Sequence, residues 1–117
     1  MDVKRGEIIY LHDSAYKNIM GAGNLQYGSR PLLVVSNDVG NRFSNICIVA
    51  PLTRKKKKSL PTHYQIKNDG GESLVLCEQL FTVNQSEIYR IIGKVTDYEM
   101  KEIEKCLAVS IGISARG

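Results

Sequence analysis

The sequence predicts a small, mainly β domain that ends in a single helix. Two observations predict it: short apolar runs alternate with turn-forming residues along most of the chain, and a helical pattern follows them near residue 96. The 117 residues suit one compact domain, residues 1–117, and a hydrophobic content of 43% is enough to bury a core. Five or six short strands before a terminal helix indicate a small, strongly curved sheet or barrel.

The expected strands are six segments: residues 8–11, 31–36, 46–52, 63–66, 74–77 and 91–95. The second and third are almost wholly apolar, as expected for strands that are covered on both faces. Asn68-Asp69-Gly70-Gly71 favours a hairpin between the fourth and fifth strands. Residues 13–29 contain three glycines and little periodicity, which indicates a long loop of the kind that often carries function.

The helix is expected to begin at Thr96. Thr96 and Glu99 have the spacing of a capping box, in which each side chain accepts a hydrogen bond from the other residue's backbone N–H. Apolar residues then recur at spacings of three and four, at Met100, Ile103, Leu107 and Ile111. These residues share one helical face, which should pack against the sheet or against a partner subunit.

The cysteines indicate an intracellular protein without a disulfide framework. Cys47, Cys77 and Cys106 lie far apart, each within an apolar run, and are expected to be small buried residues. No apolar run is long enough to span a bilayer, and the first residues do not have the pattern of a signal peptide. A cytoplasmic protein with no membrane association is therefore expected.

The charges are unevenly distributed. The net charge is +4, and Arg54 to Lys58 form an uninterrupted basic run, whereas four acidic residues lie late in the chain, at Asp97, Glu99, Glu102 and Glu104. This pattern predicts a basic loop and a more acidic terminal helix, which is compatible with a polyanionic partner. No cluster of acidic residues, histidines or cysteines has the spacing of metal ligands, and there is no P-loop, so neither a metal nor a cofactor is expected.

Two residues are candidates for chemistry because of where they lie. Arg30 stands at the junction between the glycine-containing loop and an apolar strand, and Thr53 ends a buried strand directly before the basic run. A surface arginine and an ordinary strand threonine are the alternative interpretations. His12 and His63 could form an acid–base pair, but they lie far apart in strand-like contexts, which disfavours that role.

Six segments, in order, resemble the MazF/PemK family of bacterial toxins. Two of them are Gly28-Ser29-Arg30-Pro31, which opens an apolar strand, and Ala50-Pro51-Leu52-Thr53. The others are residues 4–8, 37–44, 60–63 and 77–80. The resemblance implies an SH3-like barrel of the MazF/PemK/CcdB type, a homodimer, and a cognate antitoxin with an acidic, partly disordered segment. It also implies metal-independent cleavage of single-stranded RNA (mRNA) to a 2′,3′-cyclic phosphate and a 5′-hydroxyl.

By position, Arg30 and Thr53 match the catalytic pair of that family. The attacking group would be the RNA's own 2′-hydroxyl, so the protein need supply only charge stabilisation and proton transfer. Arg30 would neutralise the phosphoryl oxygens and Thr53 would hold the phosphate or the attacking hydroxyl in line, which leaves the general base unassigned. The residues expected to contact RNA are Asn37, Gln79, Gln26, Tyr27, Arg54 and Lys55.

The sequence departs from the family pattern at two places. The segment before Arg30 is longer than usual and lacks the customary glutamate, and Phe81 stands where many members have an arginine. Both changes should alter the RNA sequence that is cut. Two other functions stay open: a non-catalytic toxin on the same fold that binds a protein such as a topoisomerase, and a degenerate RNA-binding or regulatory member. The presence of both Arg30 and Thr53 favours the nuclease.

Overall fold

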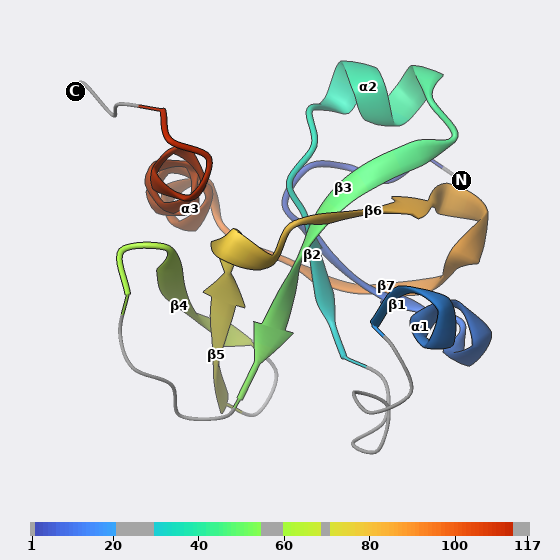
Figure 1. The fold of residues 1–117 in the computed structure, drawn as a ribbon, viewed down its shortest axis with the longest axis horizontal. Helices are drawn as coiled ribbons and strands as arrows, with labels where there is room; N and C mark the ends of the chain where they lie inside the picture. Colours follow the sequence, from blue (N-terminus) through green and yellow to red (C-terminus); the bar gives the residue numbers. More distant parts are fainter. Residues whose placement is uncertain (1, 21–29, 55–59, 69–70, 114–117) are drawn as a thin grey trace.

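The computed structural model of the chain describes residues 2–20, 30–54, 60–68 and 71–113. Within these residues an antiparallel sheet follows the order β4-β5-β3-β2-β1-β7, and β6 pairs with β3 (Figure 1). The strands are β1 (Glu7–Leu11), β2 (Leu32–Val34), β3 (Ile46–Thr53), β4 (His63–Asn68), β5 (Gly71–Leu76), β6 (Phe81–Asn84) and β7 (Ile88–Lys94). The prediction of a mainly β fold with a C-terminal helix is confirmed, and the described strands form an open, curved sheet in which β4 and β7 are not paired.

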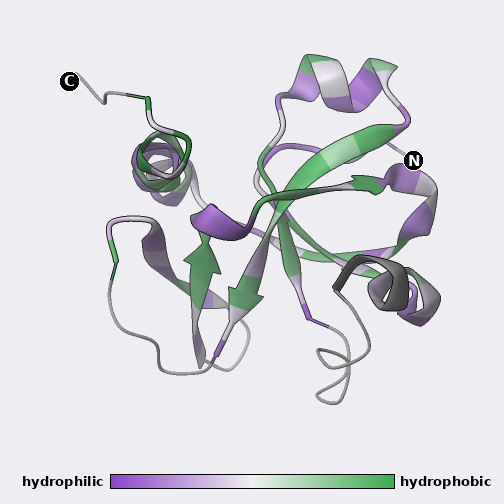
Figure 2. Ribbon diagram, in the orientation of Figure 1, coloured by the Kyte–Doolittle hydropathy of each residue, from purple (hydrophilic) through white to green (hydrophobic). Residues whose placement is uncertain are grey.

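The apolar strands β2 and β3 separate two cores. Leu33 and Leu52 face the first core, which also receives α3 (Asp97–Ser110), whereas Leu32 and Val49 face the second core. The second core is covered by α1 (Asp13–Met20), whose Tyr16 is 1% exposed. Figure 2 shows the resulting hydrophobic colouring along both strands. Burial on two faces explains why these strands are apolar at nearly every position.

Strand β3 changes partner part of the way along its length. Ile46–Val49 pair with β6, and Leu52 and Thr53 pair with β5. Pro51, which has no backbone N–H, lies between the two pairings, so a proline is tolerated within a buried strand. The short 3-10 helix η2 (Cys77–Gln79) connects β5 to β6 beside this point.

Helix α3 begins as the sequence predicts. The Thr96 side chain accepts a hydrogen bond from the Glu99 backbone N–H at 3.0 Å, and the Glu99 carboxylate accepts one from the Thr96 N–H at 2.9 Å. Met100 and Ile103 are buried, as expected, but the assignment of Ile111 to the same face is wrong. The helix ends at Ser110, so Ile111 is 60% exposed, and Cys106 occupies the next buried position instead.

Three further elements differ from the prediction. Residues 13–20, expected to begin a long loop, form α1, because Ala15 and Tyr16 are buried in the second core. Residues 38–43, expected to form a turn, make α2 (Asp38–Phe43). Strand β6 was not expected, and the described chain has seven strands rather than five or six.

Other expectations are confirmed. Asn68 pairs with Gly71, as the predicted hairpin requires. All three cysteines are buried and free. Among the described helices, none is both long enough and apolar enough to cross a membrane.

Candidate active site

The pairing of β2 with β3 brings Arg30 and Thr53 together. Leu32 is opposite Pro51, and continuing this register by two residues sets Arg30 opposite Thr53. A hydrogen bond of 3.0 Å from the Leu52 N–H to the Pro31 carbonyl extends the ladder to this point. Because Pro31 and Leu52 form a hydrogen-bonded pair, the next pair is a non-hydrogen-bonded one, in which Cβ atoms lie roughly 4.5–5.5 Å apart.

These two side chains share the face of the sheet that carries the second core. Thr53 is 7% exposed and pairs through its backbone with Leu74 of β5, while Arg30 is half-buried. Phe81 lies on the same face, because it is opposite Val49, four residues before Thr53 in β3. Phe81 packs on the second core, so an apolar ring lies on the same face as Arg30 and Thr53.

Tyr16 holds the backbone at Arg30 in place. Its hydroxyl donates a hydrogen bond to the Arg30 carbonyl and accepts one from the Leu11 N–H at 3.0 Å. Burial raises the pKa of Tyr16 to about 12, so the hydroxyl keeps its proton. The sequence analysis missed this residue. The available signal was the recurrence of Ile19 and Met20 three and four residues after Tyr16, which is a helical spacing, but the hydrogen-bond partners of Tyr16 lie on other elements.

Arg54 is positioned by a glycine. A Cβ atom added to Gly71 of β5 would lie 2.8 Å from Nη1 of Arg54, so the guanidinium lies directly over that backbone. Gly71 therefore leaves room for the side chain of Arg54, which follows the last residue of β3, Thr53. Lys55, Gln26 and Tyr27, the other residues expected to contact RNA here, are outside the described residues.

Asn37 and Gln79 are not brought to the Arg30–Thr53 pair by contacts within one chain. Asn37 lies beyond the opposite end of β2 and caps α2, where its Oδ1 accepts a hydrogen bond from the Gly40 N–H at 2.7 Å. Gln79 is exposed on η2. Sequence reasoning assigned RNA contacts to both residues. Within one chain the fold places Asn37 at the N-terminus of α2, and its contact with RNA stays a prediction.

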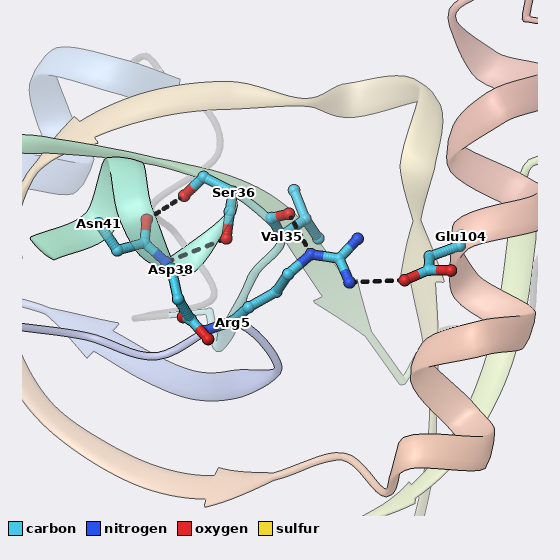
Figure 3. Close-up of polar contacts among 6 residues, drawn as sticks. All are labelled: Arg5, Val35, Ser36, Asp38, Asn41 and Glu104. Carbon is cyan, nitrogen blue, oxygen red and sulfur yellow. Dashed lines mark hydrogen bonds and ion pairs between the residues drawn. The ribbon is translucent and has the colours of Figure 1, made fainter.

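The segment that follows Asn37 is fixed by a polar network (Figure 3). Its members are Arg5, Val35, Ser36, Asp38, Asn41 and Glu104. Arg5 donates from its backbone to the Asp38 carboxylate at 2.7 Å and from Nη1 to the Glu104 carboxylate at 2.6 Å. The network thus joins α2 and α3 to the entry of β1, so the motif at residues 37–44 has a structural function in this chain.

The two histidines do not form a pair. His12 is exposed, and its ring contacts Tyr89. His63 has a side chain that is only 4% exposed, and its Nε2 lies 2.9 Å from Oε2 of Glu78. Burial alone would raise the pKa of Glu78, but hydrogen bonds to its carboxylate, from His63 and Thr62 among others, hold that pKa below its ordinary value. In the described part of the chain, no group of three or more histidine, cysteine or acidic side chains could hold a metal ion.

The fold matches solved toxins over nearly its full length. A mycobacterial endoribonuclease solved with its cognate antitoxin has a TM-score of 0.77 at 23% identity, covering 97% of this chain and 99% of that one. MazE–MazF from Deinococcus radiodurans has a TM-score of 0.72 at 17% identity, covering 97% and 99%. At these identities the likeness defines the fold: it is that of the MazF-type toxins.

The sequence gives the family. Residues 4–111 match the family described as the PemK-like, MazF-like toxin of type II toxin–antitoxin systems. Endoribonuclease EndoA of Bacillus subtilis (strain 168) is 36% identical over 118 residues, which cover 97% of both chains. The chain belongs to this PemK-like, MazF-like toxin family.

Proposed function

We propose that this toxin is an endoribonuclease that cleaves single-stranded RNA, with the RNA's own 2′-hydroxyl as the nucleophile. The phosphate that is cut would bind at the site formed by Arg30 and Thr53. The observation that carries the proposal is the register of β2 and β3, which sets the cation of Arg30 opposite the hydroxyl of Thr53 on one face. The similarity to endoribonuclease EndoA supports cleavage of RNA as the activity. Arg54, which follows Thr53, adds a second cation for the RNA backbone.

The chemistry is an exchange of phosphate esters. The 2′-oxygen forms a bond to the phosphorus and loses its proton, while the bond from phosphorus to the 5′-oxygen breaks and that oxygen gains a proton. The products are a 2′,3′-cyclic phosphate and a 5′-hydroxyl. Arg30 neutralises charge on the phosphoryl oxygens, where it is greatest in the transition state. Thr53 orients the phosphate, since a hydroxyl does not act as a base at neutral pH.

The test is cleavage of a long unstructured RNA by the wild type, Arg30→Ala, Thr53→Val and Thr53→Ser. Loss of one contact of this kind lowers kcat by about a hundred- to a thousand-fold. We expect that loss for Arg30→Ala, a smaller loss for Thr53→Val, and partial recovery in Thr53→Ser. Activity should persist in EDTA, and mass analysis should find the cyclic phosphate. Wild-type cleavage by a folded Arg30→Ala protein would reject the site. Absence of cleavage by the wild type would instead leave a non-catalytic topoisomerase-binding or RNA-binding toxin as the alternative.

The proposal includes partners. The mycobacterial endoribonuclease was solved with a cognate antitoxin. For this chain, with a net charge of +4 and a basic run beginning at Arg54, we expect an acidic, partly disordered antitoxin segment. Its affinity should fall as salt rises, because exposed charges are screened. An affinity that is equal at low and high salt would contradict the electrostatic part.

A homodimer in the cytoplasm completes the proposal. Val39 and Phe43 of α2 are 71% and 79% exposed, which gives a second copy an apolar surface. A stable interface usually buries more than about 1,200 Å². Light scattering at micromolar concentration should give twice the mass of the chain, and a monomer would contradict this. The cytoplasm is the compartment in which mRNA is available.

A further inference from the structure

The face of the sheet that carries the candidate active site continues across β5 and β4. Thr53 is opposite Leu74 of β5, and Leu74 is opposite Gln65 of β4. Residues that are directly opposite each other in a sheet project from the same face. The neighbouring row runs from Leu52 to Tyr64, and both of these contact the first core, on the opposite face. Gln65 therefore shares the face of Thr53.

This face is closed on one side of the active-site pair and open on the other. Towards β1, Leu11 and Leu32 are 2% and 0% exposed in the second core, which α1 covers. Towards β4, three polar residues of the same face are exposed: Gln65, Glu72 and Lys67. Figure 1 shows β4 and β5 on the side of β3 that is away from α1. An RNA strand that crosses the described part of the sheet at this level therefore runs over β5 and β4.

Gln65 lies within reach of a nucleotide close to the cut. Neighbouring strands are about 4.8 Å apart, so Gln65, two strands away, is roughly 10 Å from Thr53. A stacked strand advances about 3.4 Å per nucleotide and an unstacked one advances further, so about one to three nucleotides cover this distance. Lys67, which is opposite Glu72, adds an exposed cation for the phosphates on this path.

The side chain of Gln65 is oriented by Glu72. Its Nε2 donates a hydrogen bond to Oε2 of the Glu72 carboxylate. An ionised carboxylate only accepts hydrogen bonds, so the NH2 group of the amide faces Glu72 and the carbonyl is directed away from it. In this orientation the amide combines an acceptor with a second N–H. Adenine has the matching edge, an amino donor beside a ring nitrogen that accepts, and glutamine amides pair with that edge through two hydrogen bonds.

We propose that Gln65, oriented by Glu72, recognises an adenine of the RNA within about three nucleotides of the phosphate that is cut. This inference rests on the proposed function and gives it a base-specific contact. A pair of hydrogen bonds of this kind discriminates between bases by about five- to one-hundred-and-fifty-fold.

The test is cleavage of an RNA of mixed sequence, with sequencing of the cut ends and kcat/KM on short RNAs that differ at one position. At one position near the cut, wild type should prefer adenine by the factor given above. Gln65→Ala should cut all four bases at that position at similar rates and keep the preferences at every other position. Glu72→Gln should weaken the same preference, because an amide can donate or accept and no longer fixes the orientation of Gln65.

Two further variants separate this contact from the catalytic site. Thr82→Ala removes an exposed side chain of β6 on the opposite face, since Thr82 is one residue from Phe81, and it should keep the preference for adenine. Arg30→Ala should slow cleavage at every site and leave that preference unchanged. If Gln65→Ala still prefers adenine, or loses its preferences at all positions equally, Gln65 does not recognise a base, although the endoribonuclease function stands. Absence of cleavage by the wild type would overturn that function and this inference with it.

Discussion

The hydroxyl of Tyr16 should be required both for stability and for catalysis. Tyr16→Phe leaves the ring in the second core but removes the acceptor for the Leu11 N–H and the donor to the Arg30 carbonyl. The Leu11 N–H is buried, and leaving such a group without a partner costs about 1–3 kcal/mol. With an unfolding entropy of about 2.1 cal/mol/K per residue, a loss of about 2 kcal/mol lowers the Tm of this 117-residue chain by roughly 8 °C.

Catalysis should fall as well, because the backbone that carries Arg30 loses its tether. A displacement of about 1 Å at a catalytic group costs up to a hundred-fold, so we expect kcat to fall by about ten- to a hundred-fold. Calorimetry and single-turnover cleavage below the Tm measure the two effects. Ile103→Ala is the control, since Ile103 is fully buried in the other core and its loss costs about 2–5 kcal/mol. If Tyr16→Phe is less stable but cleaves like Ile103→Ala, Tyr16 does not position Arg30.

Three other perturbations have defined outcomes. Since the pKa of Tyr16 is raised from 10.0 to about 12, its contribution to stability is complete below pH 10 and is lost as the pH rises towards 12. In urea unfolding, the free energy of unfolding of Tyr16→Phe should therefore fall less steeply with rising pH than that of wild type. The pKa of Glu78 is lowered, so its contribution to the free energy of unfolding is present above pH 4.5 and is lost as the pH falls. Glu78→Gln should therefore be less stable than wild type at pH 7, and the difference in unfolding free energy, measured with urea, should disappear in acid. Gly71→Ala should displace Arg54, so that RNA binds more weakly and its affinity depends less on salt concentration. The control is Gly93→Ala, whose added Cβ meets nothing closer than 3.9 Å and which should bind RNA like wild type in the same salt titration. Equal salt slopes for the two variants would refute a role of Arg54 in RNA binding.

The elements that depend on nearby residues could be predicted from the sequence. The start of α3 is one example, because Thr96 and Glu99 satisfy each other's backbone groups. The end of the same helix was less predictable, since apolar spacing alone continued to Ile111. Strand β6 could have been found, because Phe81 and Val83 alternate with polar residues, but four residues give a weak signal.

The site was predictable only in part, because its geometry depends on contacts between distant segments. Arg30 and Thr53 were candidates because they flank buried strands, and a resemblance then matched them to a catalytic pair. Their position opposite each other follows from the register of two strands that are apolar on both faces. Helix α1 was missed because Tyr16 is anchored by Leu11 and Arg30 rather than by its own helix.

The apolar character of β2 gives this toxin a simple way to lose its activity during evolution. Deleting one codon from the segment Leu32–Val34 leaves a strand that is still apolar on both faces, so each core still receives apolar side chains from it. The deletion would nevertheless shift Arg30 by one position and turn its side chain to the opposite face of the sheet, away from Thr53. A lineage under pressure to disarm the toxin could therefore keep a folded chain, and its capacity to bind an antitoxin, without the ability to cut RNA.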